Sequence, residues 1–182
     1  ATDVYGKTLG IIGLGNIGKQ VALRAKGFNM RVIAFDFYPD EKFAAEHGIE
    51  FVSLDQLTES SDFITLHKPL TDKTQNLFDA ARIKRMKKSA FLINASRGGI
   101  VNEQDLYQAL LDNVIAGAAA DVFEQEPLAE HPLFTLSNFI PTSHIAGYTD
   151  GAISAIGERC VAQIMQCIKQ GERPTNVMNG LD

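Results

Sequence analysis

The chain has 182 residues, of which 45% are hydrophobic and 21% are charged, with a formal net charge of −5. This apolar content allows a hydrophobic core and excludes intrinsic disorder, and no apolar run is long enough to suggest a membrane span. The acidic balance, without a basic stripe, argues against a nucleic-acid-binding surface. We expect one domain over residues 1–182, located in the cytoplasm, that binds neither nucleic acid nor membranes. Because the first strand follows Ala1 so closely, we also expect the chain to be part of a longer protein.

The first predicted strand leads into a glycine-rich turn and then into an amphipathic helix. Gly13, Gly15 and Gly18 form a GxGxxG pattern, which is typical of a turn that binds the pyrophosphate of a dinucleotide. Gly13 permits the tight turn, Gly15 permits close approach of the backbone to the pyrophosphate, and Gly18 permits packing of the helix on its strand. The helix start at Asn16 and Ile17 offers unpaired N–H groups to the phosphates.

Asp36 ends the second predicted strand, at residues 31–35, and lies eighteen positions after Gly18. An acidic residue here accepts hydrogen bonds from the ribose diol of adenosine. The combination predicts a dinucleotide site rather than an ordinary glycine-rich turn. Phe37 and Tyr38 follow Asp36, so no basic neighbour in sequence would bind a 2′-phosphate. We therefore predict NAD, rather than NADP, as the cofactor.

Beyond Asp36 the chain alternates between apolar runs and helical segments. We expect strands at residues 49–52, 62–67, 89–94, 115–120 and 138–142, and helices ending near residue 47 and at 54–60, 79–87, 103–111 and 149–170. Nearly continuous apolar strands separated by helices are typical of a doubly wound parallel sheet, the Rossmann fold of the α/β class. In the last helix Cys160 and Cys167 lie about 10 Å apart along the axis, too far for a disulfide. We expect them to be buried thiols, and we expect no metal site.

Polar residues follow the ends of the later strands, where ligands collect in parallel sheets. They are His67, Lys68, Pro69 and Thr74 after one strand, Ala95, Ser96 and Arg97 after the next, Asp121 and Glu126 after a third, and His144 after the last. We take these residues as candidates for cofactor contacts or catalysis. Asp121 fits either a structural role or a carboxylate that faces the nicotinamide carboxamide.

Arg97, Glu126 and His144 fit the oxidation of a secondary alcohol by NAD. The reaction needs a base for the hydroxyl proton, and an imidazole, with an ordinary pKa of about 6.5, suits that role. A carboxylate hydrogen-bonded to the ring holds its tautomer and favours the protonated form. An arginine binds a substrate carboxylate bidentately and polarises the carbonyl. Taken alone, Arg97 could be a salt-bridge partner and Glu126 an ordinary exposed residue. We interpret His131 as a surface residue of that kind. The joint position of Arg97, Glu126 and His144 at strand ends instead predicts a catalytic set.

The motifs GIIGLGNIG, HKPLTDKT, INASRGGIVNE, AAADVFEQEP and PTSHIAGYT resemble those of the cofactor domain of the D-isomer-specific 2-hydroxyacid dehydrogenases, and within them the phosphoglycerate dehydrogenase branch. The resemblance covers essentially the whole chain. It implies that Arg97 orients the substrate, that Glu126 is the carboxylate partner and that His144 is the acid/base. It further implies cofactor contacts at Asn16, Ile17, Asp36, Lys68, Thr74, Ala95, Asp121 and Ala146. Lys68 stands where relatives often have a small or apolar residue, so we expect it to contact the cofactor through its backbone only.

The resemblance implies an NAD-dependent oxidoreductase that acts on a D-2-hydroxy acid or 2-keto acid, with 3-phosphoglycerate as one candidate, and a homodimer formed through the cofactor domain. The family's substrate domain is missing from the chain. One alternative function is an NAD(H)-sensing regulatory dimer of the C-terminal-binding corepressor type. Another is a nucleotide-binding module with little turnover of its own, because half of the cleft is absent.

Overall fold

The computed structural model of the protein describes residues 2–127 and 129–171 and divides into two units, Ala1–His144 and Ile145–Asp182. The first unit contains a sheet with its helices. The described part of the second unit contains the long helix α6 (Asp150–Gln170). That residues 1–182 form one domain remains a prediction.

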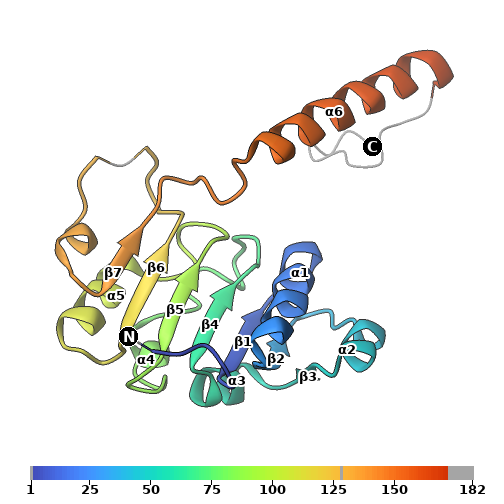
Figure 1. Cartoon of the computed structure of the whole chain (residues 1–182). Coiled ribbons are helices and arrows are strands. Elements are labelled where there is room, and N and C mark those ends of the chain that lie inside the picture. The colour runs from blue at the N-terminus through green and yellow to red at the C-terminus, as the bar shows by residue number, and fades with distance from the viewer. Residues whose placement is uncertain (1, 128, 172–182) are drawn as a thin grey trace. The chain divides into compact units, whose positions relative to one another are not determined.

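The sheet of the first unit has seven described strands in the order β3-β2-β1-β4-β5-β6-β7 (Figure 1). The strands are β1 (Thr8–Ile12), β2 (Arg31–Phe35), β3 (Glu50–Phe51), β4 (Phe63–Leu66), β5 (Phe91–Asn94), β6 (Gly117–Ala120) and β7 (Phe139–Pro141). All neighbouring pairs are parallel. The strand order reverses between β1 and β4, and such a switch point is where open α/β sheets bind ligands. The predicted doubly wound parallel sheet is confirmed.

Both faces of the central strands are buried, as the alternation of side chains along them shows. Ile11 belongs to one apolar cluster and Ile12 to a second, and Val32 and Ile33 divide in the same way. The first cluster includes residues of α1 (Asn16–Ala25) and α2 (Glu41–His47), and the second includes residues of α3 (Leu54–Ser60), α4 (Ala80–Ile83) and α5 (Glu103–Leu111). Two-sided burial explains why the central strands are continuously apolar in sequence.

The N-termini of the helices differ in how their backbone N–H groups are satisfied. A side-chain oxygen caps four helices of the first unit, from Asp40 on α2, Ser53 on α3, Asp79 on α4 and Asn102 on α5. Helix α1 instead begins after Gly15, which has no side chain to cap it, and its first turn carries no acidic residue. Its first N–H groups and the positive end of its dipole are therefore left for a ligand.

Helix α4 ends at Ile83, four residues earlier than predicted. After Ile83 the backbone changes to i→i+3 hydrogen bonds, from Arg85 N to Arg82 O and from Met86 N to Ile83 O. This tighter winding accompanies the burial of the Met86 side chain, which is 6% exposed. Tertiary packing therefore overrides the helical pattern at the end of this segment.

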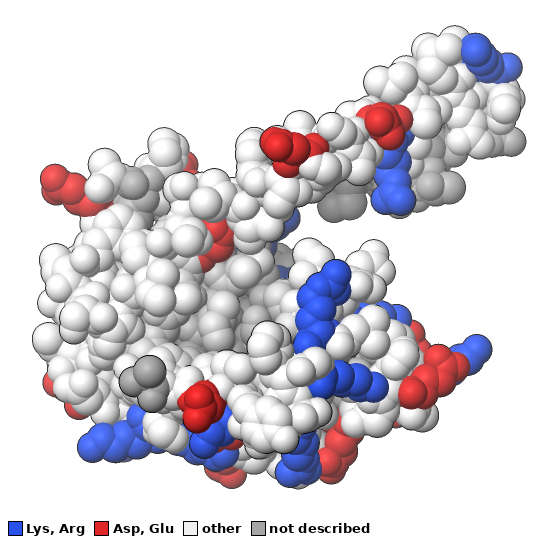
Figure 2. Space-filling view, viewed as in Figure 1, with Lys and Arg blue, Asp and Glu red and all other residues white. Residues whose placement is uncertain are grey.

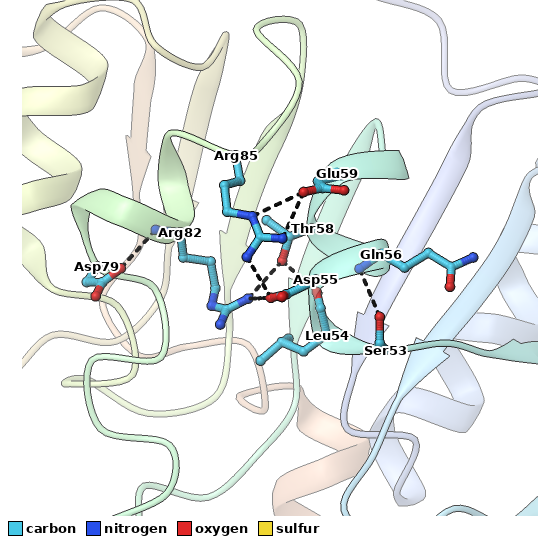
Figure 3. A network of polar contacts seen from close by, with 9 residues as sticks. All are labelled: Ser53, Leu54, Asp55, Gln56, Thr58, Glu59, Asp79, Arg82 and Arg85. Atoms are coloured by element: carbon cyan, nitrogen blue, oxygen red, sulfur yellow. Dashed lines mark hydrogen bonds and ion pairs between the residues drawn. The ribbon is translucent and has the colours of Figure 1, made fainter.

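The arginines of this segment join α4 to α3 through ion pairs. Figure 3 shows both guanidinium groups directed at carboxylates of α3, Arg82 at Asp55 and Arg85 at Asp55 and Glu59. On the face that Figure 2 shows, Lys and Arg side chains are interspersed with Asp and Glu rather than gathered into one continuous stripe. Within the basic run at residues 82–88, Arg82, Arg85 and Lys87 thus have acidic partners in the fold.

Helix α6 is amphipathic, and none of its residues is buried within its unit. Its exposed apolar side chains are Ile153, Ile156, Val161, Ile164, Met165 and Ile168. Cys160 is exposed and Cys167 is half-buried, and both are free thiols. The expectation of buried thiols is therefore wrong for the chain as it stands, because nothing within the described part of this unit packs over the helix.

Among the residues described, no helix is long and apolar enough to cross a membrane.

Candidate active site

The predicted site residues of the first unit lie at one edge of the sheet, because each follows the carboxyl end of a parallel strand. Backbone hydrogen bonds extend the strand pairing into these residues: Gly13 N to Phe35 O, His67 N to Ile12 O, Asp121 N to Asn94 O and Thr142 N to Ala120 O, at 2.8–2.9 Å. The strand exits are therefore held in register with one another. In the described ranges, 2–127 and 129–171, no three His, Cys, Asp or Glu side chains gather as metal ligands.

The glycine turn after β1 has the steric features that the sequence predicts. Gly13 has φ +100°, a conformation that favours glycine. A Cβ on Gly18 would lie 2.1 Å from the Gly13 carbonyl oxygen, so only glycine lets α1 approach its strand so closely. A Cβ on Gly15 would meet no heavy atom within 4 Å. The backbone at Gly15 is thus open beside the uncapped start of α1, where Ile17 is 65% exposed, and such an open helix start suits a pyrophosphate.

Asp36 lies at the end of β2 beside this turn, and its carboxylate is hydrogen-bonded on both oxygens. Leu14 N donates to Oδ2 at 2.8 Å, and Tyr38 N and Lys68 Nζ donate to Oδ1 at 3.0 and 2.7 Å. Burial acts to raise the pKa of Asp36, but the hydrogen bond and charge of Lys68 and the two N–H groups outweigh it and hold the pKa below its ordinary value. No basic residue is adjacent to Asp36 in sequence, but the fold brings the Lys68 ammonium group to its carboxylate. The Lys68 side chain thus contacts Asp36, and its expected backbone contact with the cofactor stays a prediction.

The residues after β4 form a tight loop next to the glycine turn. Thr74 is buried, and its hydroxyl donates to Pro69 O at 2.7 Å and accepts from Thr71 N at 2.8 Å. Thr74 thus fixes this loop, and its contact with a cofactor stays a prediction. The Nε2 of His67 lies 3.1 Å from Thr65 Oγ1, and burial lowers the pKa of the imidazole, so the ring is neutral near pH 7.

Arg97 is exposed on a turn after β5 that is organised by a buried asparagine. Asn94, 5% exposed, donates from Nδ2 to Arg97 O at 2.9 Å and accepts from the backbone and hydroxyl of Ser96 at 3.2 and 2.9 Å. The Arg97 guanidinium donates to Ser96 O at 2.6 Å. The strand pattern alone predicts Asn94 only as the end of a strand. The signal for its role in the turn is a polar residue that closes an apolar run directly before the Ser-Arg-Gly sequence.

Glu126 and His144 are in direct contact. The imidazole Nδ1 of His144 lies 2.6 Å from Glu126 Oε2, while Glu126 Oε1 accepts from Phe123 N at 2.9 Å. These hydrogen bonds, that of His144 above all, hold the pKa of Glu126 below its ordinary value. An ionised carboxylate can only accept hydrogen bonds, so the proton between the two groups is on Nδ1 of the imidazole. The other ring nitrogen, Nε2, remains available for a different partner. The predicted hydrogen bond between the two residues is present, and His144 adopts φ 57°, a left-handed conformation uncommon for a non-glycine residue.

The turn that carries Arg97 packs directly against the segment that carries Glu126. A Cβ on Gly98 would lie 2.0 Å from Phe123 O and 2.6 Å from Glu124 N. The two backbones therefore touch at Gly98, and no larger residue fits between them. This close contact ties the arginine to the histidine–glutamate pair through the backbone.

A second histidine–glutamate pair holds the other side of the Glu126 segment. Glu103 Oε2 lies 3.2 Å from His131 Nε2, and Glu103 Oε1 accepts from Glu124 N at 2.7 Å. Burial raises the pKa of Glu103 more than its partners lower it. The His131 side chain is only 18% exposed, so its interpretation as a surface residue is wrong. The sequence carried no signal for this pair, because its members are separated by β6.

Asp121 and Ala146 differ in what the structure says of them. Asp121 is 6% exposed at the end of β6 and accepts a hydrogen bond from the Thr142 hydroxyl. It is thus tied to the strand that leads to His144. Ala146 belongs to the second unit, and its contact with a cofactor stays a prediction.

A doubly wound sheet with a glycine turn at its switch point, an acidic residue after β2 and an uncapped α1 defines a dinucleotide-binding domain. Residues 1–146 match the family described as D-isomer specific 2-hydroxyacid dehydrogenase, NAD binding domain. The chain belongs to this family, and the predicted cofactor, NAD, is that of the family's domain.

Individual relatives agree with this assignment. The chain is 46% identical to a glyoxylate reductase of Korarchaeum cryptofilum over 178 residues and 45% identical to a D-3-phosphoglycerate dehydrogenase of Methanocaldococcus jannaschii over 178 residues. These alignments cover 97% of the chain but only 53% and 34% of those proteins. A structure of the D-isomer specific 2-hydroxyacid dehydrogenase from Lactobacillus delbrueckii in its NAD complexed form is similar with a TM-score of 0.88 at 31% identity, covering 98% of this chain and 57% of that one. The chain thus spans about half the length of several of its relatives.

Proposed function

We propose that the protein containing this chain transfers a hydride between NAD(H) and a small D-2-hydroxy acid or 2-keto acid. One observation carries the proposal: an imidazole hydrogen-bonded to an ionised carboxylate, His144 to Glu126, at the edge of the sheet that also holds the glycine turn. An imidazole in this arrangement is suited to exchange a proton with a substrate oxygen, since its tautomer is fixed and its Nε2 is available.

The proposed roles follow from the chemistry of each side chain. Bound NAD would accept or supply the hydride, and the open backbone at Gly15 with the start of α1 and Asp36 would hold its pyrophosphate and ribose. His144 takes the hydroxyl proton in oxidation and returns it in reduction. Glu126 orients the ring and stabilises its charged form. Arg97, exposed on its turn, binds the substrate carboxylate and polarises the adjacent carbonyl.

We propose glyoxylate and 3-phosphoglycerate as the first substrates to test, because relatives at 46% and 45% identity carry those names. The test uses the full-length protein and NADH deuterated at the transferred position, with glyoxylate, pyruvate and hydroxypyruvate as acceptors. The reverse reaction is followed with NAD and 3-phosphoglycerate, lactate or glycerate. Deuterium at C2 of one product acid is the expected result. Cofactor binding without transfer to or from any acid would contradict the proposed reaction.

The same experiment separates the enzyme from the alternative of an NAD(H)-sensing regulatory dimer. A regulator predicts NADH-promoted association and little turnover of any hydroxy acid. Dimerisation through the cofactor domain is itself part of our proposal, and sedimentation of the full-length protein with and without NADH tests it. The cytoplasmic location also remains a prediction.

A further inference from the structure

We propose that Lys68 is a specificity-determining residue of the cofactor site, and that its ion pair with Asp36 weakens discrimination against a dinucleotide bearing a 2′-phosphate. The inference rests on the dinucleotide site of the proposed function and is independent of the hydride-transfer chemistry. It concerns how strongly the protein prefers NADH over NADPH.

The ion pair is built into the fold rather than formed by mobile surface groups. The Lys68 Nζ lies 2.7 Å from Asp36 Oδ1, and the two side chains are only 14% and 9% exposed. The stem of Lys68 runs across the glycine turn, where its Cδ would be 2.7 Å from a Cβ placed on Gly13. Because Gly13 lacks that atom, the lysine can pass over the turn and reach the end of β2.

The pair changes what Asp36 offers to a ribose. The carboxylate already accepts from Leu14 N, Tyr38 N and Lys68 Nζ. The ammonium group therefore occupies an acceptor position that a ribose hydroxyl would otherwise use. It also neutralises most of the negative charge that would repel a 2′-phosphate.

A second cation lies close by. The Nζ atoms of Lys68 and Lys73 lie 5.3 and 5.9 Å from the centroid of the Phe37 ring, which is 38% exposed directly after Asp36. Lys68 thus contacts the Asp36 carboxylate itself, and Lys73 adds a second ammonium group beside the ring of the next residue. A phosphate dianion at the 2′ position beside Asp36 would gain attraction from Lys68, whereas an uncharged diol would gain little.

These contacts fix the direction of the effect of each substitution. In Lys68→Met the methionine keeps an apolar stem over Gly13 but removes the cation from the carboxylate. The negative charge then repels NADPH more strongly, and an oxygen of Asp36 is free to accept from the diol of NADH. We expect the ratio of the NADPH to the NADH dissociation constant to rise about tenfold. Asp36→Asn keeps the shape of the side chain and removes its charge, so the same ratio should fall about tenfold. In the double variant most of this improvement in NADPH binding should disappear, because the lysine that attracts the phosphate is also gone.

The experiment is equilibrium titration of the full-length wild-type, Lys68→Met, Asp36→Asn and double-variant proteins with NADH and with NADPH. Lys84→Met removes a positive charge from an exposed position after α4 and serves as the matched control. Unfolding midpoints show that each variant is folded, and the Lys68→Met arm decides the matter even where Asp36→Asn does not fold. The change in ratio should shrink as salt is raised, since the phosphate interaction is electrostatic.

The proposal would be overturned if Lys68→Met left the ratio of the NADPH to the NADH dissociation constant unchanged or lowered it. It would also be overturned if the double variant bound NADPH as favourably, relative to NADH, as Asp36→Asn does. In both cases NADH binding and turnover by the wild type would leave the proposed function intact. Conversely, binding with the expected ratios but without turnover of any acid would refute the proposed function and support the role of Lys68.

Discussion

Alanine at Gly15 and at Gly18 should separate cofactor binding from folding, because the two glycines meet different surroundings. An ideal Cβ at Gly18 lies 2.1 Å from the Gly13 carbonyl oxygen and 3.2 Å from Ile11 Cγ2. Gly13 is itself held by its hydrogen bond to Phe35 O at 2.9 Å, so its carbonyl cannot move away freely. At Gly15 the same atom has no neighbour within 4 Å, and φ −78° is open to any residue.

The expected magnitudes follow from these contacts. The clash of the new Cβ with backbone lowers the free energy of unfolding by about 3 kcal/mol, the upper end of the usual range for overpacking. The higher helix propensity of alanine raises it by about 1 kcal/mol. Gly18→Ala should therefore lower the free energy of unfolding by about 2 kcal/mol and the melting temperature by about 4 to 8 °C. Gly15→Ala should change the free energy of unfolding by less than about 0.5 kcal/mol. It should weaken NADH binding at least about tenfold, because its Cβ enters the space through which a pyrophosphate approaches the backbone.

Urea unfolding and isothermal titration with NADH, on the same preparations, check both expectations. Gly27→Ala is the control, since a Cβ there also meets nothing within 4 Å and the residue lies outside the turn. A Gly15→Ala protein that is folded and binds NADH as the wild type does would refute the steric reasoning. So would a Gly18→Ala protein of undiminished stability.

Three further outcomes are expected. Gly98→Ala should lower turnover while leaving NADH affinity unchanged, because its Cβ would lie 2.0 Å from Phe123 O and must displace the segment that carries Glu126; steady-state kinetics and titration measure the two effects. Glu126→Gln should lower turnover at least about tenfold, since the neutral amide no longer stabilises a charged imidazole; single-turnover kinetics measure it. Burial acts to raise the pKa of Asp62, but its hydrogen bonds to Lys87 and to a backbone N–H keep the pKa below its ordinary value. This stabilisation is present above about pH 4 and is lost as the pH falls through the lowered pKa. In Asp62→Asn the free energy of unfolding, measured in urea, should therefore fall less steeply as the pH is lowered in the acid range.

Each of these predictions has an outcome that contradicts it. Normal turnover in Gly98→Ala, with Gly27→Ala as the reference, would mean that the two turns can separate without effect on the site. Full activity in Glu126→Gln would remove the carboxylate from the mechanism. An acid limb equally steep in Asp62→Asn and wild type would show that other carboxylates govern acid stability.

Much of the fold could be predicted because local and tertiary preferences agree in it. The helices at residues 54–60 and 103–111 have their predicted bounds, since Ser53 and Asn102 cap them and their apolar faces match the helical period. The strands were visible as apolar runs because both faces of the sheet are covered. Helix α4 was predicted too long, since the sequence does not reveal that burial of Met86 tightens the backbone after Ile83.

The site was predictable where a strand end determines a position, and not where a side chain crosses between strands. The contact of Glu126 with His144 followed from their chemistry and from the common edge of the sheet, although their catalytic roles remain predictions. The reach of Lys68 to Asp36 did not follow, because it depends on β1 lying between β2 and β4 and on the missing Cβ of Gly13. A sequence shows no basic residue beside Asp36, whereas the fold supplies one.

The most direct test of the proposed chemistry is the turnover of a His144→Ala protein, measured together with its affinity for NADH. The imidazole is the only group to which we assign the proton transfer, and it lies on the exit of β7, apart from the glycine turn that would hold the phosphates. We predict that turnover of the preferred acid falls at least about 100-fold while the NADH dissociation constant stays close to that of the wild type. Undiminished turnover by the His144→Ala protein would contradict the mechanism.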